Sequence, residues 1–235
     1  MSTLRKIVST VRSSHKLLSS ENILTDRAIA AEIKSVTNLL VKRETNLRRL
    51  WQTDTLFTTI SCLELIEVPI SECCDYVDEC TVARTKFKLP RIAEGNYQYI
   101  IQGVWSINAM GGKTSKLKEV TINRYTNLLK LPIVKKDTYY WIVNEYLYVS
   151  NPFLTALRIA AFFEEDVPNE IMYPECGCGQ KPDPTELCKN PLDKTYGLPG
   201  YLEKQVLDMV SERLIKTYFQ IPKEQHVIDE EPKNQ

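Results

Sequence analysis

Residues 39–68 read LLVKRETNLRRLWQTDTLFTTISCLELIEV, and within this stretch a basic helical pattern gives way to an extended one. Up to Trp51, leucines and basic side chains recur at the three- and four-residue steps of a helix, whereas from Thr55 the chain is rich in Thr, Ile and Leu. The pattern predicts a long basic helix that passes into a strand within a few residues. The strand would anchor one end of the helix in a sheet, and the other end could reach outward. We therefore interpret this stretch as typical of an assembly protein that spans or joins neighbouring components.

The composition is that of an ordinary soluble globular protein, with 43% hydrophobic and 26% charged side chains among 235 residues. Thirty Lys and Arg balance thirty Asp and Glu, so no overall electric field favours nucleic acid or an anionic membrane as the partner. No apolar run approaches the roughly 18 residues of a membrane span or the length of a secretory signal. We therefore expect a cytosol-like compartment, no membrane partner, and free thiols as the default state of the seven cysteines.

Two amphipathic helices are predicted in the N-terminal part of the chain. The first runs from Leu4 to Leu18 with basic residues on its outer faces, and the second opens near Thr25 or Asp26. If unbroken through Trp51, the second helix would be about 39 Å long. Four basic residues crowd its second half and form either a solvated face or one wall of a subunit contact. These residues are Lys42, Arg43, Arg48 and Arg49.

Between Thr55 and Phe163 the hydrophobic period changes to the two-residue alternation of strands. Asn144 and Glu145 interrupt YYWIVNEYLYV as a two-residue hairpin turn, and a short helical insert is predicted around Ile122 to Leu129. Five or six strands of this kind predict an antiparallel sheet or a small barrel. The predicted strands are Thr55–Val68, Thr81–Lys88, Tyr97–Ile107, the two arms of Tyr139–Val149, and Leu157–Phe163.

The C-terminal part contains a loop dense in Gly, Pro and Cys, a last helix from about Pro199 to Phe219, and a polar tail beyond Pro222. The predicted fold class is α+β, with an N-terminal helical hairpin, a central antiparallel β-sheet or small barrel, a C-terminal helix and an extended tail. The changes of pattern divide the chain into a helical region at 1–52, a β-rich domain at 53–167, a Cys/Pro loop with the C-terminal helix at 168–220, and a flexible tail at 221–235.

Catalytic chemistry has little support in the sequence. The only histidines are His15, in the first helix, and His226, in the tail, and neither has a plausible catalytic partner near it in the sequence. The double glycine Gly111-Gly112 lacks the earlier glycine that a phosphate-binding loop requires. We therefore predict that the protein is not an enzyme and has no concave pocket of convergent polar groups.

The cysteines are the remaining candidates for chemistry. Cys176, Cys178 and Cys188 lie in a turn-rich segment that would suit thiolate ligands. Their closest pair is shorter than the usual zinc knuckle, however, and the group supplies three sulfurs where structural zinc takes four ligands. We predict no cofactor and keep a structural zinc at these cysteines as the alternative. The matching function would be a zinc-stabilised nucleic-acid-binding module, although few lysines lie near the aromatic residues of the strands.

Six phrases carry a resemblance that covers most of the chain from residue 25 to 218. They are KRETNLRRLW at 42–51, ISCLELIEV at 60–68, ARTKFKLP at 83–90, YYWIVNEYLYV at 139–149, FFEED at 162–166 and CKNPLDKTYGLPGYLEKQVLDMV at 188–210. Together they resemble a family of virion proteins from crAss-like and related tailed bacteriophages, the head-to-tail connector or ring proteins that attach beneath the portal. The match is a pattern of packing positions, and it carries over no catalytic residue.

The resemblance implies an adaptor that forms a ring of twelve identical subunits and joins the portal to tail components around the DNA channel. The implied partners are further copies of the chain, the portal protein, and other ring or tail proteins. DNA would pass through the channel without sequence-specific binding. The implied location is the head-to-tail interface of the virion, after assembly in the host cytoplasm.

A ring subunit needs lateral faces that fit copies of itself and termini that become ordered on assembly. The first candidate for partner contact is the basic group Lys42, Arg43, Arg48 and Arg49, which would meet acidic groups of a neighbouring subunit or of the portal. The second is the tail, whose apolar residues would dock on a partner as an extended segment. These apolar residues are Ile221, Pro222, Val227 and Ile228.

Overall fold

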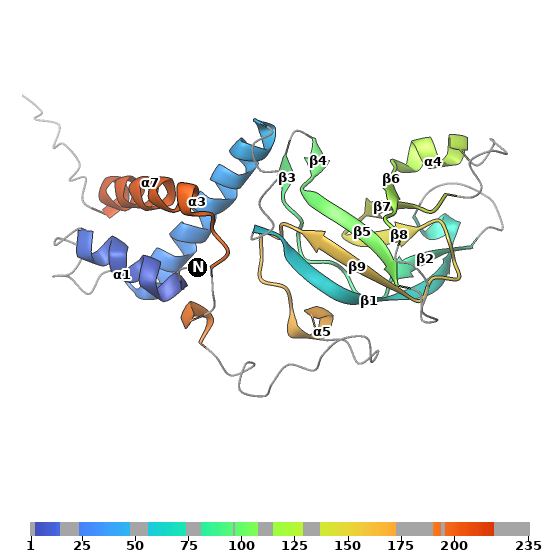
Figure 1. Cartoon of the computed structure of the whole chain (residues 1–235), viewed down its shortest axis with the longest axis horizontal. Helices are drawn as coiled ribbons and strands as arrows, with labels where there is room; N and C mark the ends of the chain where they lie inside the picture. Colours follow the sequence, from blue (N-terminus) through green and yellow to red (C-terminus); the bar gives the residue numbers. More distant parts are fainter. Residues whose placement is uncertain are drawn as a thin grey trace, which may run out of the picture.

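The computed structural model describes residues 3–14, 24–47, 56–73, 81–95, 97–107, 115–128, 137–172, 190–193 and 196–218. Within these residues, three long helices gather at one end of the long axis and the strands form a barrel at the other (Figure 1). Helices from both ends of the chain meet on the helical side. The predicted α+β class, with terminal helices and a central barrel, is confirmed.

The longest of these helices is α3, Asp26–Asn46, and its N-terminal end has a local cause. The Thr25 hydroxyl accepts a hydrogen bond from the Ala28 amide, which satisfies one of the free donors of the first turn. At the other end Leu47 is the C-cap, with a ψ of 2° that has left the helical range. α3 therefore does not run unbroken to Trp51 and is shorter than the length of about 39 Å expected for an unbroken helix, because apolar spacing does not show where the backbone turns.

Three helices share one apolar core, in which α3 packs against α1, Leu4–Ser14, and α7, Gly200–Tyr218. Ion pairs join the helices around this core: Arg12 lies 2.8 Å from Asp26, and Arg213 lies 3.0 Å from Glu32. The C-terminal helix thus completes the core that the two N-terminal helices begin. Its fully buried members include Ile7, Val11, Ile29, Ile33, Val36, Leu40, Leu202, Val206 and Val210.

The barrel has seven strands in the order β5-β9-β1-β2-β8-β7-β6, and β3 and β4 form a separate hairpin. Its pairs are antiparallel except β6 with β7, which run parallel, so the sheet is mixed. The strands are β1 Thr58–Pro69, β2 Thr81–Thr85, β3 Glu94–Gly95, β4 Gln98–Tyr99, β5 Ile101–Ile107, β6 Lys118–Glu119, β7 Tyr139–Val143, β8 Tyr146–Val149 and β9 Ala156–Ala161. Short helical elements are η2 Ile70–Glu72, α4 Ile122–Leu128, α5 Asn169–Met172 and η4 Pro191–Asp193.

The sheet is nearly closed, because the chain just before β6 returns to β5. Trp105 pairs there with Lys116, and the Leu117 amide donates to the Val104 carbonyl at 2.8 Å. Closure of this kind removes most of the free strand edge of a sheet. The interior is filled by apolar side chains, among them Ile60, Leu63, Ala83, Val104, Leu117, Leu147, Leu157 and Ile159.

The β7–β8 hairpin confirms the predicted two-residue turn. Asn144 and Glu145 have φ angles of 52° and 68°, the left-handed pair that matches the twist of a tight hairpin. The predicted helical insert is also present as α4. Tyr125 of this helix stacks on Trp141 with ring centroids 4.6 Å apart, so α4 covers the outer face of the hairpin.

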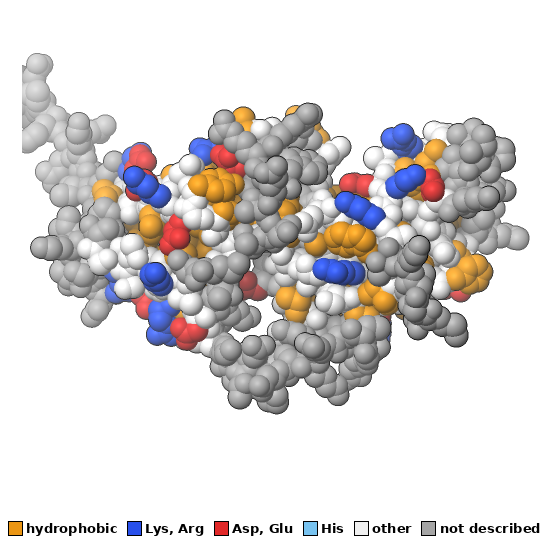
Figure 2. Space-filling view, viewed as in Figure 1, with side chains coloured by type: hydrophobic (Ala, Val, Ile, Leu, Met, Phe, Trp, Pro, Cys, Tyr) orange, Lys and Arg blue, Asp and Glu red, His pale blue; other side chains and the backbone are white. Residues whose placement is uncertain are grey.

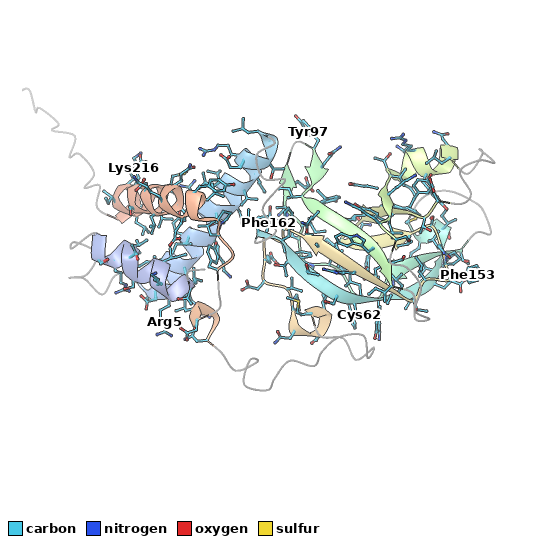
Figure 3. All side chains as sticks on the ribbon, viewed as in Figure 1. Arg5, Cys62, Tyr97, Phe153, Phe162 and Lys216 are labelled. Atoms are coloured by element: carbon cyan, nitrogen blue, oxygen red, sulfur yellow. The ribbon has the colours of Figure 1, made fainter. Side chains whose placement is uncertain are left out.

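The barrel meets the helical core at a junction where β9 ends. The Ala93 amide donates to Phe162 O at 2.9 Å, the Phe162 amide to Ile100 O at 3.0 Å, and the Ile100 amide to Ala93 O at 2.8 Å. The side chains of all three residues are buried in the helical core, and Figure 3 places Phe162 between the two parts. Two residues further on, Glu164 Oε1 lies 2.5 Å from Lys42 Nζ of α3. Burial of these side chains in the helical core and the Lys42–Glu164 ion pair therefore fix the helices to the barrel.

Several sequence predictions lie outside the described residues. They concern His15, His226, the Gly111-Gly112 loop and the tail at 221–235. The four predicted regions of the chain stay a prediction.

Two adjacent leucines of α3 give a matched test of the helical core. Leu40 is fully buried, whereas Leu39 is 47% exposed. Leu40→Ala is expected to lower the free energy of unfolding by about 2–5 kcal/mol, because it removes buried methylene groups and leaves a cavity. Leu39→Ala should change it by less than about 0.5 kcal/mol. Urea unfolding followed by circular dichroism measures both, and equal losses in the two variants would contradict this core.

Candidate assembly surfaces

The basic half of α3 makes its visible contacts within the chain. Lys42 pairs with Glu164, and Arg43 donates to Gln205 Oε1 of α7 at 2.9 Å. The Lys42 and Arg43 side chains are still 38% and 52% exposed, so each has surface left for a second partner. Arg48 and Arg49 lie outside the described residues. Contact of this basic group with another subunit stays a prediction.

The other predicted site residues also fall outside the described part of the chain. They are Cys176, Cys178, Cys188, Ile221, Pro222, Val227 and Ile228. Among the residues that the structure describes, no three His, Cys, Asp or Glu side chains gather as metal ligands. The zinc alternative therefore stays a prediction.

One cysteine departs from the expected free thiols. Cys62 is buried in β1 and is part of a disulfide. The Cys73 thiol, in contrast, donates to the Ile70 carbonyl with an Sγ–O distance of 3.3 Å. The expectation is wrong at Cys62 because a disulfide needs two Cα atoms within ~4.4–6.8 Å in space, which counting cysteines along the chain does not reveal.

A shallow cavity of about 140 Å³ opens beside the β7–β8 turn, where the sequence predicts no polar pocket. Partial burial raises the pKa of Tyr99 in its wall, and the charges of Glu94, Glu119 and Glu145 raise this pKa further. A phenol of raised pKa keeps its proton at neutral pH, so it is not an activated nucleophile. The lining residues are Leu89, Pro90, Arg91, Ile92, Glu94, Tyr99, Ile142 and Glu145.

Glu119 and Tyr140 form a hydrogen-bonded pair of titratable groups in the wall of the barrel. The Tyr140 hydroxyl donates to Glu119 Oε2 at 3.4 Å. Burial raises the pKa of the Glu119 carboxyl, and the hydrogen bond offsets part of this effect. Burial, followed by the Glu119 charge, raises the pKa of Tyr140 well above its ordinary value. Because the ionised carboxylate is disfavoured in the folded state, the pair is expected to affect the pH dependence of folding stability and not to take part in catalysis.

On the outer face of the barrel, an indole ring lies between two cations. Trp105 of β5 is paired across strands with Arg158 of β9 on one side and with Lys116 on the other. Arg158 Cζ lies 5.4 Å and Lys116 Nζ 5.8 Å from the centre of the Trp105 ring, within the range of cation–π attraction. Figure 2 shows Lys and Arg side chains on either side of hydrophobic surface over this part of the barrel. We call Lys116, Trp105 and Arg158 the Trp105 platform.

Gly103 allows the indole of the Trp105 platform to lie flat on the sheet. A Cβ at Gly103 would be 2.7 Å from two atoms of the Trp105 ring, so a larger residue would push the ring away. Gly103 lies at a register shift between β5 and β9, where a bulge re-aims side chains. Lys116 Nζ also donates to the Gln102 carbonyl at 3.0 Å. The small residue Gly103 thus leaves room for the indole, and the Gln102 carbonyl holds the Lys116 ammonium in place.

The sequence gives only a partial signal for this platform. Gly103 and Trp105 are two residues apart in a predicted strand and therefore share one face. Lys116 and Arg158 could not be assigned to that face, because their pairing with Trp105 depends on the order of strands in the sheet.

Two aromatic side chains are almost fully exposed on turns. Tyr97 is at the tip of the β3–β4 hairpin with a φ of 62°, and Phe153 is 89% exposed between β8 and β9. Figure 3 shows the two at separate points of the surface. A left-handed φ is unfavourable for a residue as large as tyrosine, and exposed aromatic residues often anchor protein contacts.

These surfaces offer contacts between chains, and a comparison with known families identifies the kind of assembly. The family model described as phage tail ring protein 2, of the crAss ring group, matches residues 6–231. The chain belongs to this family. The resemblance to ring proteins of crAss-like phages is thereby confirmed. No curated protein matches the chain.

Membership in the phage tail ring protein 2 family makes the chain a structural component of a bacteriophage virion. A ring consists of repeated subunits, so the family implies contacts with further copies and with other tail components. A structural ring family also points to a protein without catalytic activity. None of the described helices combines the length and apolar character that crossing a membrane requires.

The raised pKa of Glu119 predicts a pH-dependent effect of Glu119→Gln. The folded state holds the Glu119 proton to higher pH than the unfolded state does, so this group lowers stability as pH rises through the window between the two pKa values. Glutamine cannot ionise but can still accept the Tyr140 hydrogen bond. The variant should therefore be more stable than the natural chain at pH 7, and the two should converge on acidification. Urea unfolding between pH 4 and 7 measures the difference, and a constant or opposite trend would refute it.

Proposed function

We propose that the chain forms a ring at the head-to-tail connector of the virion, where it joins the portal to tail components around the DNA channel. The observation that carries the proposal is the family match over residues 6–231, together with the resemblance to connector rings. In this role the protein acts through its surfaces and needs no cofactor. Twelve copies surround the channel, and DNA passes through it without sequence-specific binding.

The two-part architecture supports this role. Barrel-side residues bury their side chains in the helical core, and the Lys42–Glu164 ion pair links the two parts, so one subunit can hold both at a fixed angle. A ring closes through two different faces that fit each other, because each contact repeats from head to tail. Exposed groups on separate elements provide such faces: the basic half of α3, the Trp105 platform and the Tyr97 turn.

The partner contacts that we propose come from the basic group of α3 and from the tail. The basic group would meet carboxylates of a neighbouring subunit or of the portal, and the tail would dock as an extended segment. No observation in the described residues favours the zinc-stabilised nucleic-acid module, so we do not develop it as a second function. The proposed contact residues are Lys42, Arg43, Arg48, Arg49, Ile221, Pro222, Val227 and Ile228.

Native mass spectrometry of the purified chain tests the ring directly. Twelve times 27.1 kDa is about 325 kDa, and we expect a species of that mass that increases with protein concentration. Addition of the portal protein should shift this species to a larger mass. A chain that stays at 27.1 kDa at all concentrations, with and without the portal protein, would contradict the proposal.

Charge reversal tests the basic group of α3. The variant Arg48→Glu, Arg49→Glu should raise the concentration needed for assembly by about tenfold or more, because like charges across an interface repel. Lys42 and Arg43 are left unchanged because both already bind partners inside the chain.

The matched control reverses two other exposed helix cations, Lys6 and Arg27. It changes the net charge equally and should assemble like the natural chain. The same assembly threshold in both double variants would reject a specific role for the basic group.

A further inference from the structure

We propose that the Trp105 platform binds the acidic segment Asp229–Glu231 of a neighbouring copy of the chain. The inference rests on the proposed ring and names one contact that holds the ring together. The occupant is a peptide segment with consecutive carboxylates, and the site is the pair of cations on either side of the indole.

The two cations of the platform have no carboxylate to neutralise them among the described residues. Among the described residues, Lys116 Nζ donates to the Gln102 carbonyl, and Arg158 lies over the face of the indole. Both residues are exposed. Because they pair with Trp105 from its two sides, Arg158 on β9 and Lys116 just before β6, their charges reinforce each other on one small area. This area therefore attracts an anion from another molecule.

The barrel contains a second aromatic ring between cations, which shows how such an arrangement is neutralised within the chain. Arg84 and Lys88 lie 4.3 Å and 5.7 Å from the centre of the Tyr146 ring. Each of these cations has a carboxylate partner, Glu72 for Arg84 and Glu145 for Lys88. Among the described residues, carboxylates thus serve as counterions at the Tyr146 ring but not at the Trp105 platform.

A protein carboxylate suits the platform better than a nucleic-acid phosphate. Binding to nucleic acid without sequence preference needs a basic groove that follows the backbone over several phosphates. The Trp105 platform offers two cations, and the chain as a whole has equal numbers of basic and acidic residues. A short acidic peptide can supply two carboxylates to such a small area without the long charged backbone that a basic groove would need.

The sequence contains two runs of three consecutive acidic residues, and one of them already forms ion pairs within the chain. In Glu164–Asp166, Glu164 pairs with Lys42 and Asp166 pairs with Lys34. The other run, Asp229–Glu231, is flanked by Ile228 and Pro232. These flanking residues offer apolar surface to the indole, beside the carboxylates for its two cations.

The position of α7 favours a neighbouring copy over the same chain. Figure 1 shows that α7 ends on the side of the helical part that faces away from the barrel. Eleven residues lead from Tyr218 to Asp229, and they span at most about 40 Å when fully extended. Because α7 ends on the side away from its own barrel, a platform on an adjacent subunit is the more favourable target for the acidic segment.

A charge swap tests the contact in the full chain. Lys116→Glu with Arg158→Glu should raise the concentration for half-assembly at least about tenfold, and so should Asp229→Lys, Glu230→Lys and Glu231→Lys together. The chain that carries all five changes should recover assembly, because the charges are again complementary. Recovery also shows that the reversed platform still folds. The control Lys6→Glu with Lys204→Glu should leave assembly unchanged.

Zero-length carbodiimide cross-linking tests which chain supplies the segment. The reagent joins a lysine amine to a carboxylate in direct contact. In a mixture of natural and nitrogen-15 chains, Lys116 should be linked to the 229–231 segment in peptides of mixed isotope composition. Links found only within one isotope would place the segment on its own chain and overturn the proposal.

Three further outcomes separate the alternatives. Normal assembly of both reversed variants would overturn the contact while leaving the proposed ring intact. Loss of affinity of Lys116→Glu, Arg158→Glu for a labelled DNA duplex, with assembly unchanged, would assign the platform to nucleic acid and also overturn it. If the natural chain never assembles, the proposed ring is rejected. If the Lys116 cross-link is also absent from that sample, the proposed contact between the platform and the acidic segment is rejected independently.

Discussion

The burial of the Ala93, Ile100 and Phe162 side chains in the core of the helices is the constraint on which the rest of the structure depends. Each residue belongs by its backbone to the barrel side, where the three are joined by backbone hydrogen bonds, yet its side chain lies in the helical core. Separating the two parts would therefore expose apolar surface, which is costly. The Lys42–Glu164 pair acts beside this junction as a further link.

Closure of the barrel determines which side chains can form a surface. Because the segment before β6 returns to β5, Trp105 has strands on both sides, and cations on those strands are brought to the two sides of its ring. An open sheet with the same strands would leave Trp105 at an edge with only one of these neighbours. The position of the two cations beside Trp105 is thus a consequence of how β5 and the segment before β6, at the two ends of the sheet, meet.

Ion pairs between the helices, and between α3 and the chain after β9, help to orient the elements of the molecule. Ion pairs connect α1 to α3, α7 to α3, and α3 to the chain after β9. Exposed pairs of this kind contribute little stability singly, but they orient the elements that they join. The raised pKa values of Tyr99, Tyr140 and Glu119 mean that these groups keep their protons more strongly, which suits a framework more than a catalyst.

The sequence by itself determined the elements whose cause is local. The hairpin at Asn144 and Glu145, the α4 insert and the terminal helices follow from turn residues and periodicity, which act over a few neighbouring residues. Resemblance over long phrases also indicated the ring family. Only the tertiary structure decided the end of α3 at Asn46, the parallel pairing of β6 with β7, the Cys62 disulfide and the Trp105 platform. The physical reason is that pairing across strands and burial between distant segments depend on distances in space, which residue spacing along the chain does not contain.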